Sequence, residues 1–188
     1  MEQADHLPQT ELLKDKGYEI LYLTDDIDEF ALKMLRDWDG KPFQSVSAGD
    51  LDLDTPEEKE EAKKQAEEHK SLFDAMKEAL GDKVDAVRLS KRLKSHPVCL
   101  ASEGEVSLEM EKVLNAMPAD NKVKARRVLE INENHPIFAT LSGLLDTDPD
   151  KLRDYSELLY DQALLIEGMA IEDPVAFSTR LCALMSGQ

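Results

Sequence analysis

The sequence predicts an α+β fold in which a small α/β layer precedes a helix-rich domain with a short three-stranded sheet and a terminal helical bundle. Three observations support this prediction. Apolar residues recur at helical spacing in several stretches, short apolar runs of strand length separate these stretches, and prolines next to capping residues mark the starts of the later helices. The chain has 188 residues, which is long enough to bury a core without disulfides or metals.

Residues 10–47 form the predicted α/β layer. A short helix around Leu12 and Leu13 ends at Gly17, and the apolar run at 20–23 is typical of a buried strand. Apolar side chains at helical offsets then predict a helix from residue 25 to about residue 38, which Gly40 ends. Residues 43–46 fit a second strand. Residues 1–9 are expected to be disordered or foreign to the natural chain, and residues 48–55 to be a linker.

Residues 56–188 are predicted to be a single helix-rich domain. Thr55, Pro56 and Glu58 make a capping pattern, which opens one helix that continues to Leu80. Apolar runs at 84–89, 98–100 and 128–131 predict three strands. The second of these strands should lie at an edge of the sheet, or Pro97 should mark its start, because Pro97 has no amide hydrogen to donate.

Capping patterns also predict the remaining helices. Residues 102–105 match a capping box, which would open a helix that ends at Met117 before Pro118. Three further helices are expected to begin where a capping residue is followed by proline, at residues 135–136, 148–149 and 173–174. The helix-rich domain is therefore expected to end in two consecutive helices.

The composition excludes several classes of protein. Forty acidic against 23 basic residues give a net charge of −17, which would repel a phosphate backbone, so nucleic acid is not an expected partner. No uncharged stretch approaches the roughly 20 residues that cross a bilayer, and the start of the chain lacks the pattern of a secretion signal. Cys99 and Cys182 are too few for a disulfide scaffold. The sequence therefore predicts a cytoplasmic protein with no membrane partner.

Residues that could carry chemistry have simpler interpretations. The acidic group at residues 25–29 is the expected complement of a helix N-terminus, and the basic stretches at 83–94 and 122–127 most simply balance the acidic helices. Both cysteines lie in apolar segments and are interpreted as small buried residues. The histidines are spaced unlike metal ligands, and they are interpreted as structural: His6, His69, His96 and His135.

No motif for nucleotide binding or nucleophilic catalysis is present in the sequence. The residues therefore predict no catalytic site, no metal site and no cofactor of this chain's own. The features that point to function are instead apolar surfaces.

The first surface is a stripe that we call the methionine stripe. It consists of Val106, Met110, Val113, Leu114 and Met117. Its simplest interpretation is the buried face of a core helix. The alternative is a partly exposed surface for irregular partners, because methionine side chains repack at little cost.

The second surface lies on the last two helices, whose apolar residues exceed what one helix pair can bury. A second copy of the chain is the simplest cover, and two such pairs related by a two-fold axis would make a four-helix dimerization bundle. We call the expected contact the terminal seam: Leu158, Leu165, Met169, Phe177, Leu181 and Leu184. The sequence thus predicts a homodimer.

Five segments of the chain, in order, resemble one protein family. They are KGYEILYLTDDIDEF (16–30), DGKPFQSV (39–46), VRLSKRLKSHPVCLAS (87–102), LEINENHPI (129–137) and LLYDQALLIEG (158–168). The first two are similar to the end of the middle domain of the heat shock protein 90 chaperones. The other three resemble the C-terminal dimerization domain of that family.

The resemblance implies a homodimeric, ATP-dependent chaperone that binds partly unfolded client proteins. The ATP-binding domain and the catalytic loop of the middle domain have no counterpart in this chain, so ATP and magnesium would belong to the full-length protein only. The chain ends in MSGQ and lacks the acidic tail by which cytosolic eukaryotic members bind tetratricopeptide co-chaperones, which indicates the bacterial high-temperature protein G type.

Two functions remain open at this point. The chain is either the dimerization and client-contacting part of such a chaperone, or a free-standing, non-enzymatic adaptor or scaffold that uses the same fold. Continuation of the gene upstream of Met1 into an ATP-binding domain would distinguish them.

Overall fold

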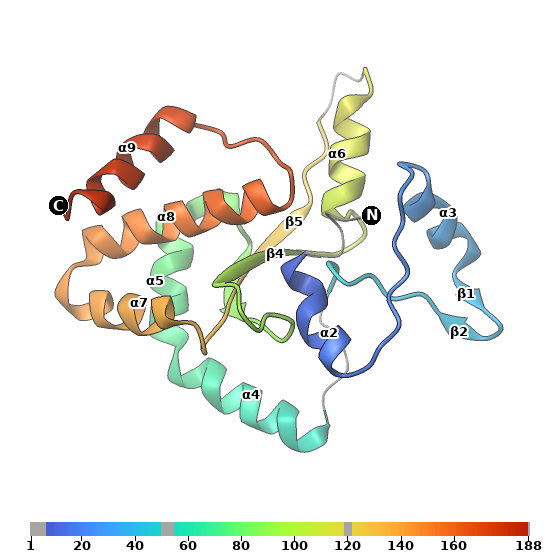
Figure 1. The fold of residues 1–188 in the computed structure, drawn as a ribbon, viewed down its shortest axis with the longest axis horizontal. Helices are drawn as coiled ribbons and strands as arrows, with labels where there is room; N and C mark the ends of the chain where they lie inside the picture. Colours follow the sequence, from blue (N-terminus) through green and yellow to red (C-terminus); the bar gives the residue numbers. More distant parts are fainter. Residues whose placement is uncertain (1–6, 50–54, 119–121, 188) are drawn as a thin grey trace.

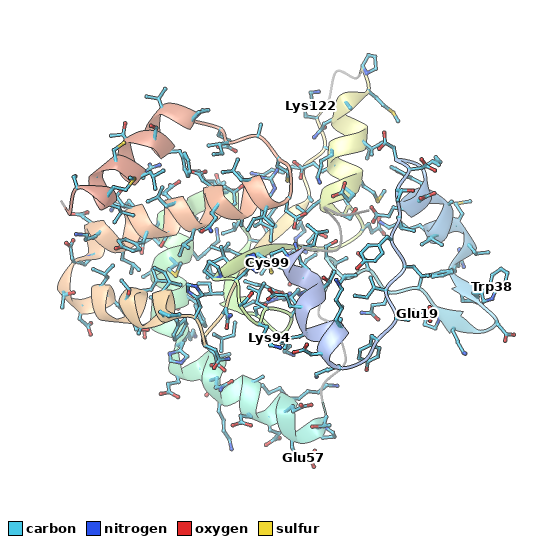
Figure 2. All side chains as sticks on the ribbon, in the orientation of Figure 1. Glu19, Trp38, Glu57, Lys94, Cys99 and Lys122 are labelled. Atoms are coloured by element: carbon cyan, nitrogen blue, oxygen red, sulfur yellow. The ribbon has the colours of Figure 1, made fainter. Side chains whose placement is uncertain are left out.

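The computed structural model describes residues 7–49, 55–118 and 122–187 (Figure 1). We call residues 7–49 the leading block. It contains η1 (Pro8–Thr10), α2 (Glu11–Asp15), α3 (Asp28–Leu35), β1 (Asp37–Trp38) and β2 (Lys41–Pro42). The β1–β2 hairpin projects from one end of the molecule, and Trp38 lies near its tip (Figure 2).

The rest of the described chain consists of helices packed around a three-stranded sheet. Its elements are α4 (Pro56–Glu68), α5 (Lys70–Leu80), η2 (Gly81–Lys83), β3 (Ala86–Leu89), β4 (Val98–Glu103), α6 (Leu108–Ala116), β5 (Arg126–Ile131), α7 (Pro136–Thr147), α8 (Pro149–Ile166) and α9 (Pro174–Met185). The predicted α+β class is confirmed.

The three strands of the main sheet lie in the order β3-β5-β4. The central strand, β5, runs parallel to β3 and antiparallel to β4, and Leu129 pairs with Val87 on one side and Leu100 on the other. All three predicted strands are therefore present. The expectation that Pro97 precedes an edge strand is also confirmed, since β4 lies at one edge of the sheet.

The hydrophobic core lies between this sheet and helices α5, α7 and α8 (Figure 1). Met76 of α5, Leu129 of β5 and Leu141 of α7 are each inaccessible to solvent. Complete burial of one such side chain contributes roughly 1.5–3 kcal/mol, so this cluster holds the domain together. α8 supplies a further buried row: Leu152, Leu159, Tyr160, Ala163 and Leu164.

The predicted helix starts are mostly correct because capping is a local interaction. The Thr55 hydroxyl accepts a hydrogen bond from the amide of Glu58, and the Glu58 carboxylate accepts one from the amide of Thr55. His135, Asp148 and Asp173 each cap a helix whose first residue is proline. Each cap satisfies backbone donors that would otherwise lack a partner.

The expected strands of the leading block are not present. Residues 20–23 have no regular secondary structure and pair with no strand in the described part of the chain, and Leu21 is 68% exposed. The prediction of a strand at 43–46 is also wrong, because the strands of this block, β1 and β2, lie earlier in the chain. An apolar run becomes a strand only when a neighbouring strand takes its hydrogen bonds, and the described chain supplies none here.

The helix expected to end at Gly40 is shorter than predicted. α3 ends at Leu35, because Arg36 takes a positive φ of 68° and the chain then enters the hairpin. At the other end, the carboxylate of Asp28 accepts hydrogen bonds from the amides of Thr24 and Asp25. Asp28 therefore closes the turn before α3. It also lies with Glu29 in the first turn of α3, where the acidic residues were expected to complement the helix N-terminus.

The single helix predicted from residue 56 to Leu80 is two helices that meet at His69. The His69 backbone departs from helical geometry and its ring packs edge-on against Phe138, with 4.8 Å between the centroids. α5 beyond this break is buried on one face, whereas α4 has no buried residue and projects away from the core (Figure 1). α4 therefore has no buried apolar face, and Ala66 is exposed.

The capping box at residues 102–105 is also not used. Ser102 belongs to β4, and its amide donates to the carbonyl of Ser47. Ser107 caps α6 instead, accepting from the amide of Met110 at 3.0 Å. Backbone pairing at the edge of the sheet thus takes precedence over a local capping pattern, and it shortens the predicted helix by one turn.

Two segments that were predicted to lie outside the folded parts of the chain contact them in the structure. Pro8 and Gln9 were expected to be disordered or foreign, but both are buried in η1. Ala48 and Gly49, expected to begin a linker, contact the edge of β4. The remaining parts of those predictions, residues 1–6 with His6 and residues 50–54, lie outside the described residues.

Candidate functional surfaces

The methionine stripe runs along α6 from a buried base to an exposed tip. Val106 packs against the core, Met110, Val113 and Leu114 are half-buried, and Met117 is 53% exposed. The fully buried apolar residue of α6 is Leu108, which lies outside the predicted stripe. The stripe therefore presents apolar surface that increases away from the sheet.

α3 of the leading block packs against the base of α6 (Figure 1). The Ser107 hydroxyl donates to the Glu29 carboxylate at 2.6 Å, and the Lys33 ammonium lies 2.8 Å from the sulfur of Met110. Part of the methionine stripe is therefore covered by residues from the first quarter of the chain.

A buried polar cluster fixes the orientation of α6. Glu111 binds the guanidinium of Arg127 and accepts a hydrogen bond from the amide of Ala125 at 2.8 Å. Arg127 also donates to the Tyr160 hydroxyl at 2.6 Å. Burial raises the pKa of Tyr160, although the Arg127 charge opposes this shift. These contacts tie α6 to β5 and α8, so its outward face is held in place.

The terminal seam is only partly exposed. Leu158 is buried and Met169 packs against the core of its own chain. Phe177 and Leu184 of α9 are half-buried, whereas Leu165 of α8 is 52% exposed. The chain's own packing therefore already uses two of the six predicted residues.

α9 carries the largest uncovered apolar area of the terminal pair. None of its residues is buried, although it packs along α8 (Figure 1). Leu181 is 41% exposed, Val175 76% and Met185 80%. The prediction that Cys182 is buried is wrong for the single chain, because the α9 face that carries it is open to solvent.

The leading block also forms a groove that the sequence did not indicate. Its volume is about 1210 Å³, and it is lined by apolar and polar residues of 7–47, among them Asp25, Glu29 and Lys33, together with Glu109, Val113 and Glu167. Tyr18, Leu21 and Leu23 of this lining are all at least 46% exposed. The apolar run at 20–23 was the available signal, but as an expected buried strand it did not suggest an open surface.

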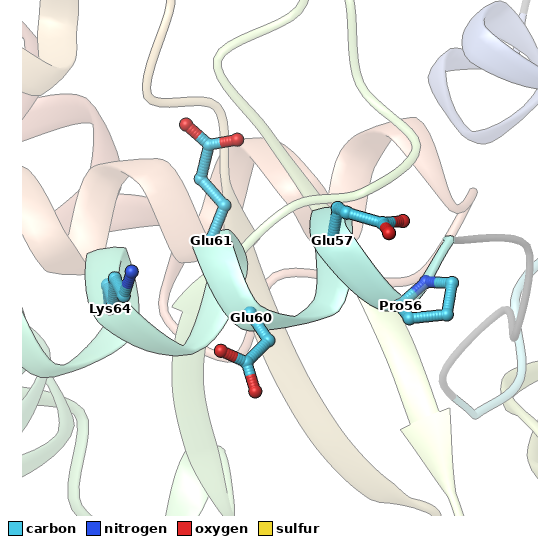
Figure 3. A pocket seen from close by; sticks show the side chains of 5 residues that line it. All are labelled: Pro56, Glu57, Glu60, Glu61 and Lys64. Atoms are coloured by element: carbon cyan, nitrogen blue, oxygen red, sulfur yellow. The ribbon is translucent and has the colours of Figure 1, made fainter.

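A second hollow of about 610 Å³ lies on α4 and is lined by Pro56, Glu57, Glu60, Glu61 and Lys64. In Figure 3, the three carboxylates of this hollow point in different directions and do not converge on a common point. Charged side chains on an exposed helix face are an ordinary solvated surface. We therefore assign this hollow no ligand.

The remaining candidate groups have structural roles in the described ranges. His96 binds the Glu11 carboxylate, with 2.9 Å between Nδ1 and Oε1, and His135 caps α7. Burial raises the pKa of the Cys99 thiol well above its usual value. The described residues contain no group of three or more His, Cys, Asp or Glu that could hold a metal ion, and no helix among them could span a bilayer.

The basic stretches pair with carboxylates, as expected, but two of their arginines are buried. Arg92 is 1% exposed and lies beside Glu130, and Arg127 is 7% exposed and binds Glu111. At the surface, Lys94 binds Asp15 and Arg126 binds Asp85. The acidic partners come from strands and loops as well as helices, which the sequence did not indicate.

The accessible apolar residues of the described chain thus lie on helix faces and in a groove of mixed polar and apolar lining, an arrangement typical of proteins that bind other polypeptides. Comparison with known proteins identifies the family. The family model described as Hsp90 protein matches residues 1–188, and the chain belongs to this family.

Similar bacterial proteins carry the name Chaperone protein HtpG. The proteins from Clostridium perfringens and Bacillus subtilis are 57% and 56% identical to the chain over 184 residues, and that from Shouchella clausii is 58% identical. Each match covers 98% of this chain but only 29% of the relative. The chain therefore spans less than a third of the length of these proteins.

Proposed function

We propose that the chain is the C-terminal dimerization and client-contacting part, with the end of the middle domain, of an ATP-dependent chaperone of the Hsp90 family. Family membership and the name of the relatives support the chaperone role. The 29% share of the relatives' length favours a part of a larger protein over a free-standing adaptor. Nucleotide and magnesium would be bound in the part of the protein that this chain does not span.

The observation that carries the proposal is the uncovered apolar face of α9. Leu181, Val175 and Met185 are exposed on a helix that has no buried residue of its own. An obligate interface removes on the order of 2,000 Å² or more from water, at roughly 25 cal/mol per Å² of its apolar part. A second copy that supplies the same face would cover these side chains symmetrically.

Partly unfolded clients would contact the methionine stripe. Its tip is exposed, its base is held by the Glu111–Arg127 cluster, and thioether side chains adapt to irregular partners. The two cysteines are free thiols, which fits a location in the reducing cytoplasm. The net charge of −17 does not favour a nucleic acid partner.

The oligomeric state tests the proposal. Light scattering after size exclusion should give about 42 kDa for the parent, twice the 21.2 kDa of one chain, and about half that for Leu181→Glu. The substitution places an unpaired charge in the interface of both copies. Ser71→Glu, at an exposed serine of α5 outside the two terminal helices, is the control that adds the same charge, and it should remain dimeric. A monomeric parent, or a Leu181→Glu variant that dimerizes as tightly as the parent, would contradict this assignment.

A further inference from the structure

Both ends of the leading block attach to one loop, residues 90–96 between β3 and β4, which we call the anchoring loop. At the first end, the amide of Leu12 donates to the carbonyl of Arg92 at 3.3 Å. The Glu11 carboxylate accepts from the amides of Lys94 and Ser95 at 2.8 and 2.9 Å. At the other end, the Arg92 guanidinium donates to the carbonyls of Val46 and Gly49, the second at 2.7 Å.

Arg92 is held in this position by a buried carboxylate. The Nε atom of Arg92 lies 2.9 Å from Oε2 of Glu130, so the two side chains form an ion pair, although the N–H of Nε does not point at the carboxylate. The side chain of Arg92 is 1% exposed and that of Glu130 is 2% exposed. Glu130 is itself fixed by Arg88, at 2.9 Å, and by the hydroxyl of Ser90, at 3.0 Å. Arg92 therefore has little freedom to leave the carbonyls that it binds.

The segment that Arg92 binds has few other attachments to the sheet. The amide of Ser102 donates to the carbonyl of Ser47 at 3.0 Å, and the amide of Gly49 donates to the carbonyl of Ser102 at 2.8 Å. These two bonds form an isolated parallel bridge between Ala48 and Ser102, at the edge of β4. Arg88 of β3 also donates to the carbonyl of Gly49, at 3.4 Å. Two backbone bonds at an exposed sheet edge and one long side-chain bond are a weak attachment by themselves.

We propose that Arg92 and Glu130 form a clamp that fixes residues 46–49 on the edge of β4 and so sets the position of the leading block on the sheet. The clamp would also determine how α3 lies against α6, where Glu29 and Lys33 cover the base of the methionine stripe. This inference goes beyond the proposed function and does not depend on dimerization or client binding.

The energetics of a buried ion pair fit a positioning role. Removing two charges from water costs about as much as their attraction returns, so an apolar pair of similar size would stabilise the core equally well. An apolar pair could not, however, donate hydrogen bonds to two carbonyls of a neighbouring segment. The planar guanidinium with its fixed donors can do so while it faces Glu130.

Amide hydrogen exchange on the whole chain tests the clamp. The double variant Arg92→Met with Glu130→Met keeps the site filled and removes both charges. The amides of Gly49 and Ser102 should then exchange at least about tenfold faster, because their segment loses two charge-assisted bonds. The amide of Asp85, which donates to Arg127 across the sheet, and the amide of Leu152, which donates to Asp148 in α8, should keep their parental rates.

Two further variants complete the test. Arg126→Met makes the same chemical change at an exposed arginine that does not contact residues 46–49, and it should leave the Gly49 and Ser102 amides unchanged. Arg92→Lys keeps the positive charge beside Glu130, but an ammonium group lacks the planar arrangement of donors with which the guanidinium binds both carbonyls. The amides of Gly49 and Ser102 should therefore again exchange faster. If the double variant does not fold, the Arg92→Lys result decides.

Two outcomes would overturn the proposal. In the first, the Gly49 and Ser102 amides exchange at parental rates in the folded variants. In the second, these amides and those of Asp85 and Leu152 accelerate by the same factor, which would mean that the pair stabilises the core as a whole and has no particular effect on residues 46–49.

Discussion

A buried carboxylate at the end of α8 should make the stability of this chain depend on pH. Glu167 is 9% exposed and accepts a hydrogen bond from Nε2 of Gln9, so it joins η1 to the C-terminal helices. Burial raises its pKa from 4.5 to about 7; Lys112 and Arg92 oppose this shift, and Glu109 adds to it. The Oε1 atom of Gln9 is buried without a hydrogen-bond partner in the described chain, and a protonated Glu167 brings a donor to this contact.

The direction of the effect follows from the raised pKa. The folded chain binds the proton more tightly than the unfolded chain, so the contribution of Glu167 to stability is fully present below pH 4.5 and is lost as the pH rises through 7. A shift from 4.5 to about 7 corresponds to about 3 kcal/mol in total. About 2.5 kcal/mol of this amount falls between pH 5 and pH 8.

Urea unfolding of the parent and of Glu167→Gln at several pH values measures this contribution. Glutamine does not titrate, so the free energy of unfolding of the parent relative to the variant should fall by about 2.5 kcal/mol from pH 5 to pH 8. Glu172→Gln, a nearby exposed position, is the matched control and should show no such trend. A difference between parent and Glu167→Gln that is constant, or that grows with pH, would refute the reasoning.

Two further predictions concern the proposed chaperone role. Replacing Met110 and Val113 by serine should weaken the suppression of aggregation of a model client, with little change in melting temperature. Glu109→Ser, at an exposed position of the same helix, is the control and should leave the suppression unchanged. If the melting temperature of the double serine variant falls by several degrees, Met110 and Val113 belong to the core. Calorimetry with ATP and magnesium should show no saturable heat, because the sequence has no phosphate-binding loop, and a micromolar site with one nucleotide per chain would contradict this prediction.

Predictions from the sequence succeeded where the determining interaction is local. A capping side chain reaches only two or three residues along the chain, so the starts of α4, α7, α8 and α9 could be read directly. The strands of the main sheet were also predictable, because each is an apolar run and β5 takes hydrogen bonds from both neighbours. The class and the order of the elements follow from these signals.

The predictions failed where a distant segment decides the outcome. Residues 20–23 have the composition of a strand, but no strand pairs with them in the described chain. Ser102 has the pattern of a helix cap, but Ser47 takes its amide hydrogen bond. Arg92 lies in a basic stretch typical of surface, yet Glu130, which lies on β5, makes its burial possible. None of these partners can be found by spacing alone.

The two interpretations of the methionine stripe each apply to a different part of it. α6 rises away from the sheet, so the distance of a residue from the sheet determines whether core atoms surround it (Figure 1). Val106 lies at the base and packs against the core, whereas Met117, after the last turn, is 53% exposed. Helical periodicity assigns both residues to one face but carries no information about height above the sheet. A substitution at the base should therefore affect folding, and one at the tip should affect binding alone.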